Sequence, residues 1–274
     1  MGGSSNAACF DRLRPRTPEL LYVAGQTHRF LGRQYRLLAD PEAPSGVALG
    51  RNHLRMLQHE GVPAERLRLL RSFDPRSGAH PDDVELGCAA TLAKEISRGK
   101  KVGILDLTRG ELGTRGTAEI RDQEAKAAGE ILGIQMRHNL EFSDGFFINN
   151  VSHQLEIIKM IRKYRPDLVL CNAIDDRHID HGKGAKLVAD ACFLSGLRKI
   201  ETICEGNKQN AWRPKSVYHY IQWKNLNPDV VVDVSGFIDV KMASVKAYKS
   251  QFFDENSKEP STPISNLNFL ESIS

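Results

Sequence analysis

Residues 167–187 carry the sequence DLVLCNAIDDRHIDHGKGAKL. The stretch opens with an apolar run over 167–172, passes through a cluster of acids and histidines, and continues into a helical pattern from His181. A short apolar run of this kind predicts a buried strand, so the histidine cluster lies where a strand ends and a helix begins. Open α/β sheets bind their ligands beyond the carboxyl ends of the strands. We therefore expect a functional site at this end of the sheet.

The chain after residue 79 repeats this alternation of strand and helix patterns. Hydrophobic spacing predicts helices over 84–99, 117–133, 153–164, 181–196 and 240–252, and strands over 100–107, 167–172, 217–223 and 228–235. Alternation of this type favours an α/β fold with a Rossmann-like, mostly parallel sheet and helices on both of its faces.

A second polar cluster, His80-Pro81-Asp82-Asp83, precedes the helix predicted over 84–99. Taken alone, Pro-Asp and Asp-Asp pairs are common turn formers and a single histidine is usually structural. The cluster His178-Ile179-Asp180-His181 changes this interpretation. The two clusters together supply histidine and carboxylate ligands for a metal and one further carboxylate. Catalytic zinc takes three such ligands plus a water, and the protein supplies a base for that water. The two clusters together predict a mononuclear zinc hydrolase.

Longer motifs extend the pattern beyond these clusters. The run Ala79–Asp83 (AHPDD) resembles the signature of the LmbE-like (PIG-L) N-acetylglucosaminyl deacetylases. Further stretches are similar to the branch of that family that acts on N-acetylglucosaminyl L-malate in bacillithiol biosynthesis; they are 108–125, 139–147, 171–184, 212–223 and 247–253. The resemblance covers residues 79–274, which we expect to form the deacetylase domain.

The resemblance implies roles for residues of both clusters. His80, Asp83 and His181 match the metal ligands, with Zn²⁺ as the expected ion and Fe²⁺ as the alternative. Asp82 matches the general base that takes a proton from the attacking water. His178 matches the histidine that stabilises the tetrahedral oxyanion or protonates the leaving amine.

Three further residues receive roles from the same resemblance. Asp180 matches a carboxylate that orients the His178 imidazole. Arg121 matches a basic residue that faces the substrate, and Asp144 matches a carboxylate near the sugar hydroxyls. For Arg121 the alternative is an ion pair with Glu124 on a solvated helix face.

The function that the resemblance implies is the removal of acetate from an N-acetylglucosaminyl conjugate, foremost the L-malate conjugate. Two alternatives remain open: another N-acetylglucosamine conjugate as substrate, or an inactive α/β scaffold that acts as a binding protein. The expected partner is a small glycoside. Nucleic acid is not expected, because no motif for its recognition accompanies the modest positive charge. Self-association is left open.

Bulk composition agrees with a cytoplasmic enzyme. The 274 residues are 41% hydrophobic and 26% charged, which suffices for a sizeable core. Five cysteines without framework spacing indicate a reducing compartment. No apolar run approaches the length of a membrane span, and no secretory signal is evident at the start.

Residues 1–78 differ in composition from the remainder. All twelve of their basic residues are arginine, against seven acids, whereas the later part is nearly neutral. The run LRLLRSFDPRSG (67–78) resembles a loop of low-molecular-weight tyrosine phosphatases, but their C-x5-R nucleophile loop is missing. We expect a partly ordered, Arg-rich appendage without chemistry of its own. Its arginines also predict that the first central strand is missing or displaced, and the C-terminus looks truncated against the family.

Overall fold

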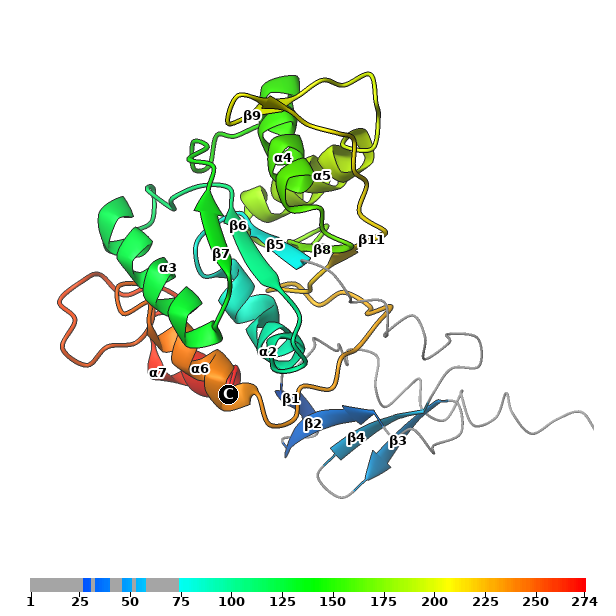
Figure 1. The fold of residues 1–274 in the computed structure, drawn as a ribbon. Coiled ribbons are helices and arrows are strands. Elements are labelled where there is room, and N and C mark those ends of the chain that lie inside the picture. Colours follow the sequence, from blue (N-terminus) through cyan, green and yellow to red (C-terminus); the bar gives the residue numbers. More distant parts are fainter. Residues whose placement is uncertain (1–26, 31–32, 40–45, 51–52, 58–73) are drawn as a thin grey trace, which may run out of the picture.

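The computed structural model describes residues 27–30, 33–39, 46–50, 53–57 and 74–274 (Figure 1). Ahead of residue 74 the described residues form one sheet of four strands in the order β1-β2-β4-β3. Its strands β2 and β4 are parallel, while the two outer pairs are antiparallel. The strands are β1 (Thr27–Phe30), β2 (Arg33–Ala39), β3 (Gly46–Gly50) and β4 (His53–Leu57). The boundary at residue 78 and the appendage's lack of chemistry stay predictions.

The main sheet has five strands in the order β11-β8-β5-β6-β7. Every neighbouring pair is parallel, which confirms the expected α/β class. The strands are β5 (Asp74–Gly78), β6 (Val102–Asp106), β7 (Met136–Asn139), β8 (Leu168–Cys171) and β11 (Ser216–His219).

Helices cover both faces of this sheet (Figure 1). One face carries α4 and α5, and the other carries α2, α3 and α6. Each layer buries an apolar core against the strands, for example Ile157 and Val188 on one side and Leu92 and Ile104 on the other. The helices are α2 (Asp83–Ser97), α3 (Ala118–Leu132), α4 (Val151–Tyr164), α5 (Ile179–Leu194), α6 (Ile238–Lys246) and α7 (Leu267–Ser272).

The central strand that we expected to be missing or displaced is present as β5. It is in register with β6 over residues 74–78, and the ladder continues as Leu107 N–H donates to the carbonyl of Gly78. Towards β8, one residue of the described strand, Arg76, is in register. Pro75 has no N–H to donate to a neighbour, which weakens such pairing. Arg68 and Arg71 lie outside the described residues.

The strand predicted over 228–235 is wrong. This segment does not join the sheet; instead Val234 is buried against Ala90 and Ile238, and Val232 packs on the same cluster. Val232 and Val234 therefore pack against α2 and α6, and the Lys94 ammonium donates a hydrogen bond to the carbonyl of Asp233. The sequence analysis did not predict three features after residue 79: the edge strand β7, the short hairpin of β9 (Ile203–Cys204) and β10 (Asn207–Lys208), and the helix α7.

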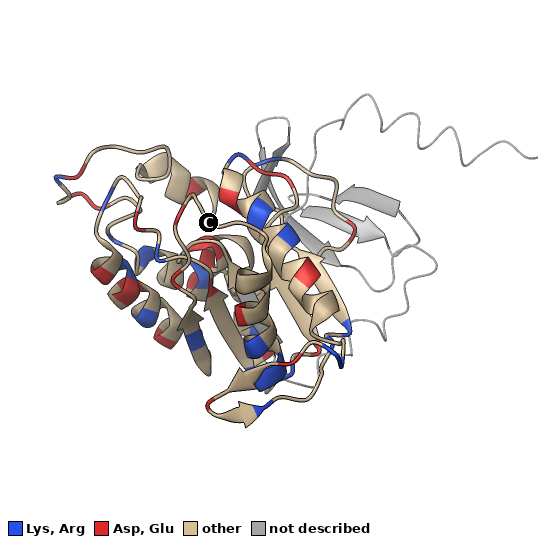
Figure 2. Cartoon of the chain, turned by 90° about the horizontal axis from the view of Figure 1, so that it is seen from above, with Lys and Arg blue, Asp and Glu red and all other residues tan. Residues whose placement is uncertain are grey.

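Charged residues of both signs are interspersed over the helices and loops in the view of Figure 2. Among the described residues, no helix combines the length and the apolar composition that crossing a bilayer requires.

Candidate active site

The two polar clusters lie at the carboxyl ends of the neighbouring strands β5 and β8. The chain leaves β5 into α2 on one face of the sheet and leaves β8 into α5 on the other. Loops that diverge in this way open a crevice at the switch point of the strand order, where doubly wound sheets bind ligands. The topology therefore explains why segments about a hundred residues apart form one site.

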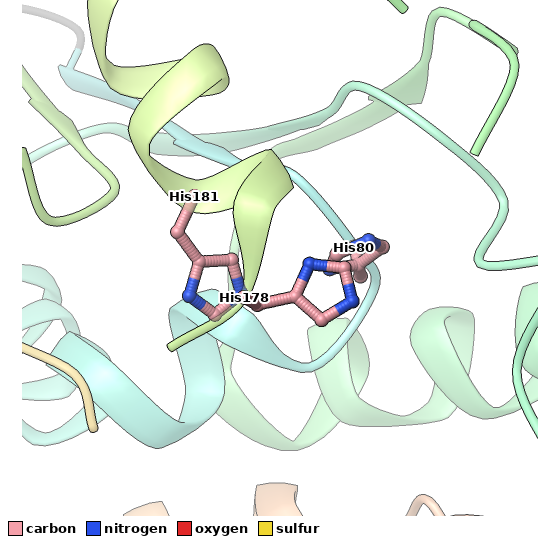
Figure 3. Close-up of side chains that lie close together, drawn as sticks. All are labelled: His80, His178 and His181. Atoms are coloured by element: carbon pink, nitrogen blue, oxygen red, sulfur yellow. The ribbon is translucent and has the colours of Figure 1, made fainter. Parts of the chain in front are cut away.

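Three histidines meet in this crevice (Figure 3). The ring centroid of His178 lies 4.6 Å from that of His80 and 5.2 Å from that of His181, and the outer pair is 5.7 Å apart. His80 comes from the loop after β5, whereas His178 and His181 come from the start of α5, so the structure brings both sequence motifs together.

Asp83 lies between two of these imidazoles. Its Oδ1 is 3.1 Å from Nε2 of His181, and its Oδ2 is 3.5 Å from Nδ1 of His80. Asn172 donates to Oδ2 at 2.9 Å and Gln222 donates to Oδ1 at 3.0 Å. Burial disfavours the charged carboxylate, but His181 and His80 outweigh this cost and hold the pKa of Asp83 well below its usual range.

The other nitrogen of His80 faces two buried carboxylates. Its Nε2 is 3.0 Å from Asp144 Oδ1 and 3.4 Å from Asp180 Oδ2. Burial lowers the pKa of His80, but these carboxylates and Asp83 outweigh it and raise that pKa well above its usual value.

This geometry corrects the expected partner of Asp180. The carboxylate of Asp180 contacts His80 and accepts hydrogen bonds from Gly145 N–H at 2.7 Å and from the Lys183 ammonium at 3.1 Å. Its link to His178 is instead a backbone one, because Asp180 N–H donates to His178 Nδ1 at 3.3 Å. The reason is that His178 is the N-cap of α5, so its side chain accepts from the first turn.

Asp144 lines the crevice, as the predicted contact with the sugar requires, but both of its oxygens already have protein partners. Oδ1 faces His80, and Oδ2 accepts the N–H of Leu112 at 3.0 Å. Burial raises its pKa, yet the hydrogen bond and the charge of His80, together with the N–H of Leu112, outweigh this and lower the pKa of Asp144. A role in holding His80 is therefore visible in the structure, whereas contact with the sugar stays a prediction.

A further carboxylate, Asp176, holds His181. Its Oδ2 is 2.5 Å from His181 Nδ1, and its Oδ1 accepts the N–H of Lys224 at 2.7 Å. Burial opposes the charged imidazole, but Asp83 and Asp176 outweigh it and raise the pKa of His181 to about 9.

The donor atoms fit a divalent metal ion. Two groups of three among the described residues have donor atoms within 4.8 Å of one another: His80, His178 and His181, and His80, Asp144 and Asp180. Asp83 adds a carboxylate beside two imidazole nitrogens of the first group. Imidazole nitrogen with carboxylate oxygen is the donor chemistry of catalytic zinc and also suits ferrous iron.

The side chain of Asp82 bonds Arg121 rather than a histidine. The guanidinium donates to Asp82 Oδ2 at 3.0 Å, to the carbonyl of Pro81 at 2.6 Å and to Gln251 Oε1 at 3.2 Å. Burial raises the pKa of Asp82 to about 7, helped by Asp83 and opposed by Arg121. Arg121 is buried, and Glu124 bonds Ser250 instead, so the alternative of a solvated Arg121–Glu124 ion pair is wrong.

His178 has the features of a neutral hydrogen-bond donor. Burial, with the neighbouring His80 and His181, lowers its pKa. Because its Nδ1 accepts the N–H of Asp180, the proton of the neutral ring resides on Nε2. A neutral imidazole in this tautomer can donate a hydrogen bond to a developing oxyanion.

These groups lie in a pocket of about 600 Å³. All eight site residues predicted from the sequence except Asp180 line it. Apolar side chains also line it: Leu86, Leu112, Ile179, Ile221, Trp223, Pro263, Ile264, Phe269 and Ile273. The volume falls in the usual range for small-molecule sites.

Several residues that bond the predicted set were missed by the sequence analysis. Among them are Asp176, Asn172, Gln222 and Gln251. The sequence could have indicated the first three only by their position at or just after the end of a predicted strand. Asn172 and Asp176 lie in the loop between β8 and the second cluster, and Gln222 follows the last strand at the same edge of the sheet.

Comparison with known proteins agrees with this fold. The family model "PIG-L: GlcNAc-PI de-N-acetylase" matches residues 77–192. Diacetylchitobiose deacetylase of Thermococcus kodakarensis is 30% identical over 183 residues, which cover 63% of this chain and 67% of that protein. The crystal structure of a conserved protein from Thermus thermophilus superposes with a TM-score of 0.61 at 39% identity, over 65% of this chain and 79% of that one.

The chain thus belongs to the PIG-L family of de-N-acetylases. The structure of N,N'-diacetylchitobiose deacetylase from Pyrococcus horikoshii has the same fold, with a TM-score of 0.60 at 21% identity over 72% of this chain and 83% of that one.

A separate short match concerns another protein class. Low molecular weight protein-tyrosine phosphatase A of Mycobacterium tuberculosis is 67% identical over 39 residues, which are 14% of this chain and 24% of that protein. This confirms that the chain contains a segment similar to such phosphatases. The run 67–73, part of the stretch on which we based this resemblance, lies outside the described residues.

Proposed function

We propose that this protein is a metal-dependent N-deacetylase that hydrolyses the acetamide of an N-acetylglucosaminyl conjugate. The observation that carries the proposal is that the adjacent carboxylates Asp82 and Asp83 have different surroundings. Asp83 lies between imidazole nitrogens of His80 and His181, while Asp82, with a pKa of about 7, lines the same pocket. A metal-binding group and a separate base near neutrality are the two requirements of metal-assisted amide hydrolysis.

His80, Asp83 and His181 would hold the metal, with Zn²⁺ preferred and Fe²⁺ as the alternative. A bound divalent ion supplies Lewis-acid polarisation of the amide carbonyl and acidifies water. Asp82 accepts the proton of the attacking water, and Arg121 fixes the orientation of Asp82 through their 3.0 Å contact. His178 donates its Nε2 hydrogen to the carbonyl oxygen as negative charge develops there. Asp82 then returns the proton to the amine nitrogen as the C–N bond breaks, releasing acetate and the free amine.

The finer proposal for the substrate is N-acetylglucosaminyl L-malate. The family model and the Thermococcus relative are both named for compounds that contain N-acetylglucosamine. The exposed Arg177 is a cationic residue that lines the pocket. Its guanidinium carbon lies 4.7 Å from the ring centroid of Trp223, which also lines the pocket. A guanidinium there can pair with the carboxylates of a malate group, while Trp223 offers an apolar surface.

Release of free amine from three substrates tests both levels of the proposal. These are N-acetylglucosaminyl L-malate, the methyl glycoside of N-acetylglucosamine and diacetylchitobiose, each assayed with added Zn²⁺ or Fe²⁺. We expect the malate conjugate to have the highest kcat/KM, and Arg177→Ala to remove that preference while sparing the neutral glycoside. Arg198→Ala, at an exposed arginine outside the pocket, is the control. Preference for a neutral substrate overturns the malate assignment, and no turnover of any substrate favours the inactive-scaffold alternative.

A further inference from the structure

The carboxylate of Asp176 is held on both sides within the site. Its Oδ2 lies 2.5 Å from His181 Nδ1, and its Oδ1 accepts the backbone N–H of Lys224 at 2.7 Å. The side chain is only 1% exposed. The loop after β11, which contains Lys224, therefore fixes the carboxylate, and the carboxylate in turn fixes the imidazole.

This contact determines which nitrogen of His181 can bind a metal. A neutral imidazole has one protonated nitrogen and one free lone pair. The nitrogen nearest Asp83 is Nε2, at 3.1 Å, so a metal held by Asp83 and His181 needs the lone pair on Nε2 and the proton on Nδ1. A proton on Nδ1 requires an acceptor, and Asp176 Oδ2 is placed to accept it.

The neighbouring histidines form an internal comparison. His80 has the same arrangement in mirror image, with Nδ1 towards Asp83 and Nε2 towards Asp144. His178 differs, because its Nδ1 accepts a backbone N–H and is not bonded to a carboxylate in the described contacts. The two imidazoles beside Asp83 therefore each have a carboxylate on their far nitrogen, whereas the imidazole proposed as an oxyanion donor has a backbone N–H on its Nδ1 instead.

We propose that Asp176 is a positioning residue that holds His181 in the metal-binding tautomer and orientation. The proposal rests on the metal site of the proposed function and assigns a residue to it that does not itself bind the ion. Carboxylates behind metal-binding histidines commonly raise metal affinity.

Asp176→Asn separates this role from a merely structural one. The asparagine Oδ1 can still accept the Lys224 N–H, so the loop remains anchored. Its amide nitrogen, however, donates to Nδ1 of His181 and thereby shifts the proton to Nε2, where it blocks the lone pair. Asp175→Asn is the matched control, because Asp175 is 63% exposed and pairs with the Lys224 ammonium at 2.7 Å.

The measurement is Zn²⁺ affinity, determined by competition with a chelator in the full chain, together with a thermal melt of each variant. We expect Asp176→Asn to weaken Zn²⁺ binding by roughly 10–100-fold while melting near the wild type, and Asp175→Asn to bind as the wild type does. Asp176→Glu keeps an acceptor and should bind more tightly than Asp176→Ala, which provides a second comparison if the asparagine variant folds poorly.

The outcomes distinguish this inference from the proposed function. Wild-type affinity in Asp176→Asn, or Asp176→Glu binding no better than Asp176→Ala, overturns the role of Asp176 and leaves the proposed metal site standing. A wild-type chain that binds no Zn²⁺ or Fe²⁺ overturns the proposed function and this inference with it.

Discussion

At the scale of single residues, the backbone separates the tasks of two adjacent carboxylates. Asp82 has φ 117°, a positive value that is costly for a residue other than glycine, and α2 begins at Asp83. The turn directs Asp83 towards His80 and His181 and leaves Asp82 with Arg121. Strained backbone of this kind is often retained at functional sites.

This separation predicts different losses in two conservative variants. Asp82→Asn should retain the metal and lose hydrolysis by about 10²–10⁴-fold, because the base is gone. Asp83→Asn should lose both metal and activity. Metal content and kcat of the two purified variants check the prediction. Near-normal turnover in Asp82→Asn would place the base elsewhere.

A residue outside the site gives a pH-dependent prediction. Lys241 is 1% exposed, and its ammonium has a 3.5 Å contact with the carbonyl of Ile273. Burial lowers the pKa of Lys241 to about 8, whereas an unfolded lysine titrates near about 10.4. The unfolded state thus binds more protons between these values, so the Lys241 contribution to stability improves as pH rises through this window.

Lys241→Met should therefore be more stable than the wild type at pH 7, by up to about 3 kcal/mol, because the methionine needs no buried charge. The advantage should shrink between pH 8 and pH 10. Urea unfolding of both proteins across this range measures the difference, and an advantage independent of pH would contradict the assigned pKa.

At the scale of elements, one buried guanidinium fastens the turn after α5 to α4. Arg162 donates to the carbonyls of Ser195, Ile200 and Leu197 at 2.7–3.0 Å and to the Thr202 hydroxyl at 2.8 Å. These bonds satisfy backbone carbonyls that follow the end of the helix. The start of α5 carries His178 and His181, so this fastening also stabilises a helix that positions the site.

Arg162→Lys keeps the charge but cannot reproduce the fork of donors. We expect a loss of about 2–4 kcal/mol in the free energy of unfolding, because several buried carbonyls lose their partners. The neighbouring Lys163→Ala removes an exposed ion pair with Glu205 and a contact with the Tyr164 ring, and it should cost less than about 1 kcal/mol. Equal denaturant midpoints for the two variants would refute the role of Arg162.

Prediction from the sequence succeeded where periodicity decides the element. The predicted helices 117–133 and 153–164 correspond to α3 and α4, which begin at the capping residues Thr117 and Asn150. It failed for 228–235, where Val232 and Val234 pack on helices and the segment does not pair as a strand. The edge strand β7 has the sequence MRHN, which contains no apolar run that would predict a strand. Its Arg137 bonds Asp106.

The same limit applies to the site. Two short motifs with a familiar residue pattern were enough to single out residues that share one pocket. The contacts of Asp180 and Asp176 depend on which imidazole nitrogen faces which carboxylate, and sequence spacing carries no information on that point. Their partners required the three-dimensional arrangement.

At the scale of the whole molecule, the C-terminal segment closes one side of the pocket. Residues 261–264 line it, and the ring of Phe269 in α7 stacks between those of Trp223 and Phe252, with centroids 6.3 and 6.0 Å away. The stack joins the loop after β11 to the segment that follows α6. The segment after α6 therefore both lines the pocket and packs on the loop after β11.

Phe269→Ala should raise KM for the N-acetylglucosaminyl substrate by about 3–10-fold, with a smaller effect on kcat, because stacked aromatic pairs contribute about 0.5–1.5 kcal/mol each. Phe253→Ala is the control, since Phe253 is exposed and does not line the pocket. Equal KM values for the two variants would show that the stack does not shape the substrate site.

The central claim is that one metal ion, held by His80, Asp83 and His181, enables amide hydrolysis. Its most direct test is the rate of acetate release from N-acetylglucosaminyl L-malate as metal-free protein is titrated with Zn²⁺. The account predicts that the rate rises in proportion to added metal and levels off at one equivalent, and that His181→Ala shows no such rise. Full activity of the metal-free protein in the presence of a chelator would contradict it.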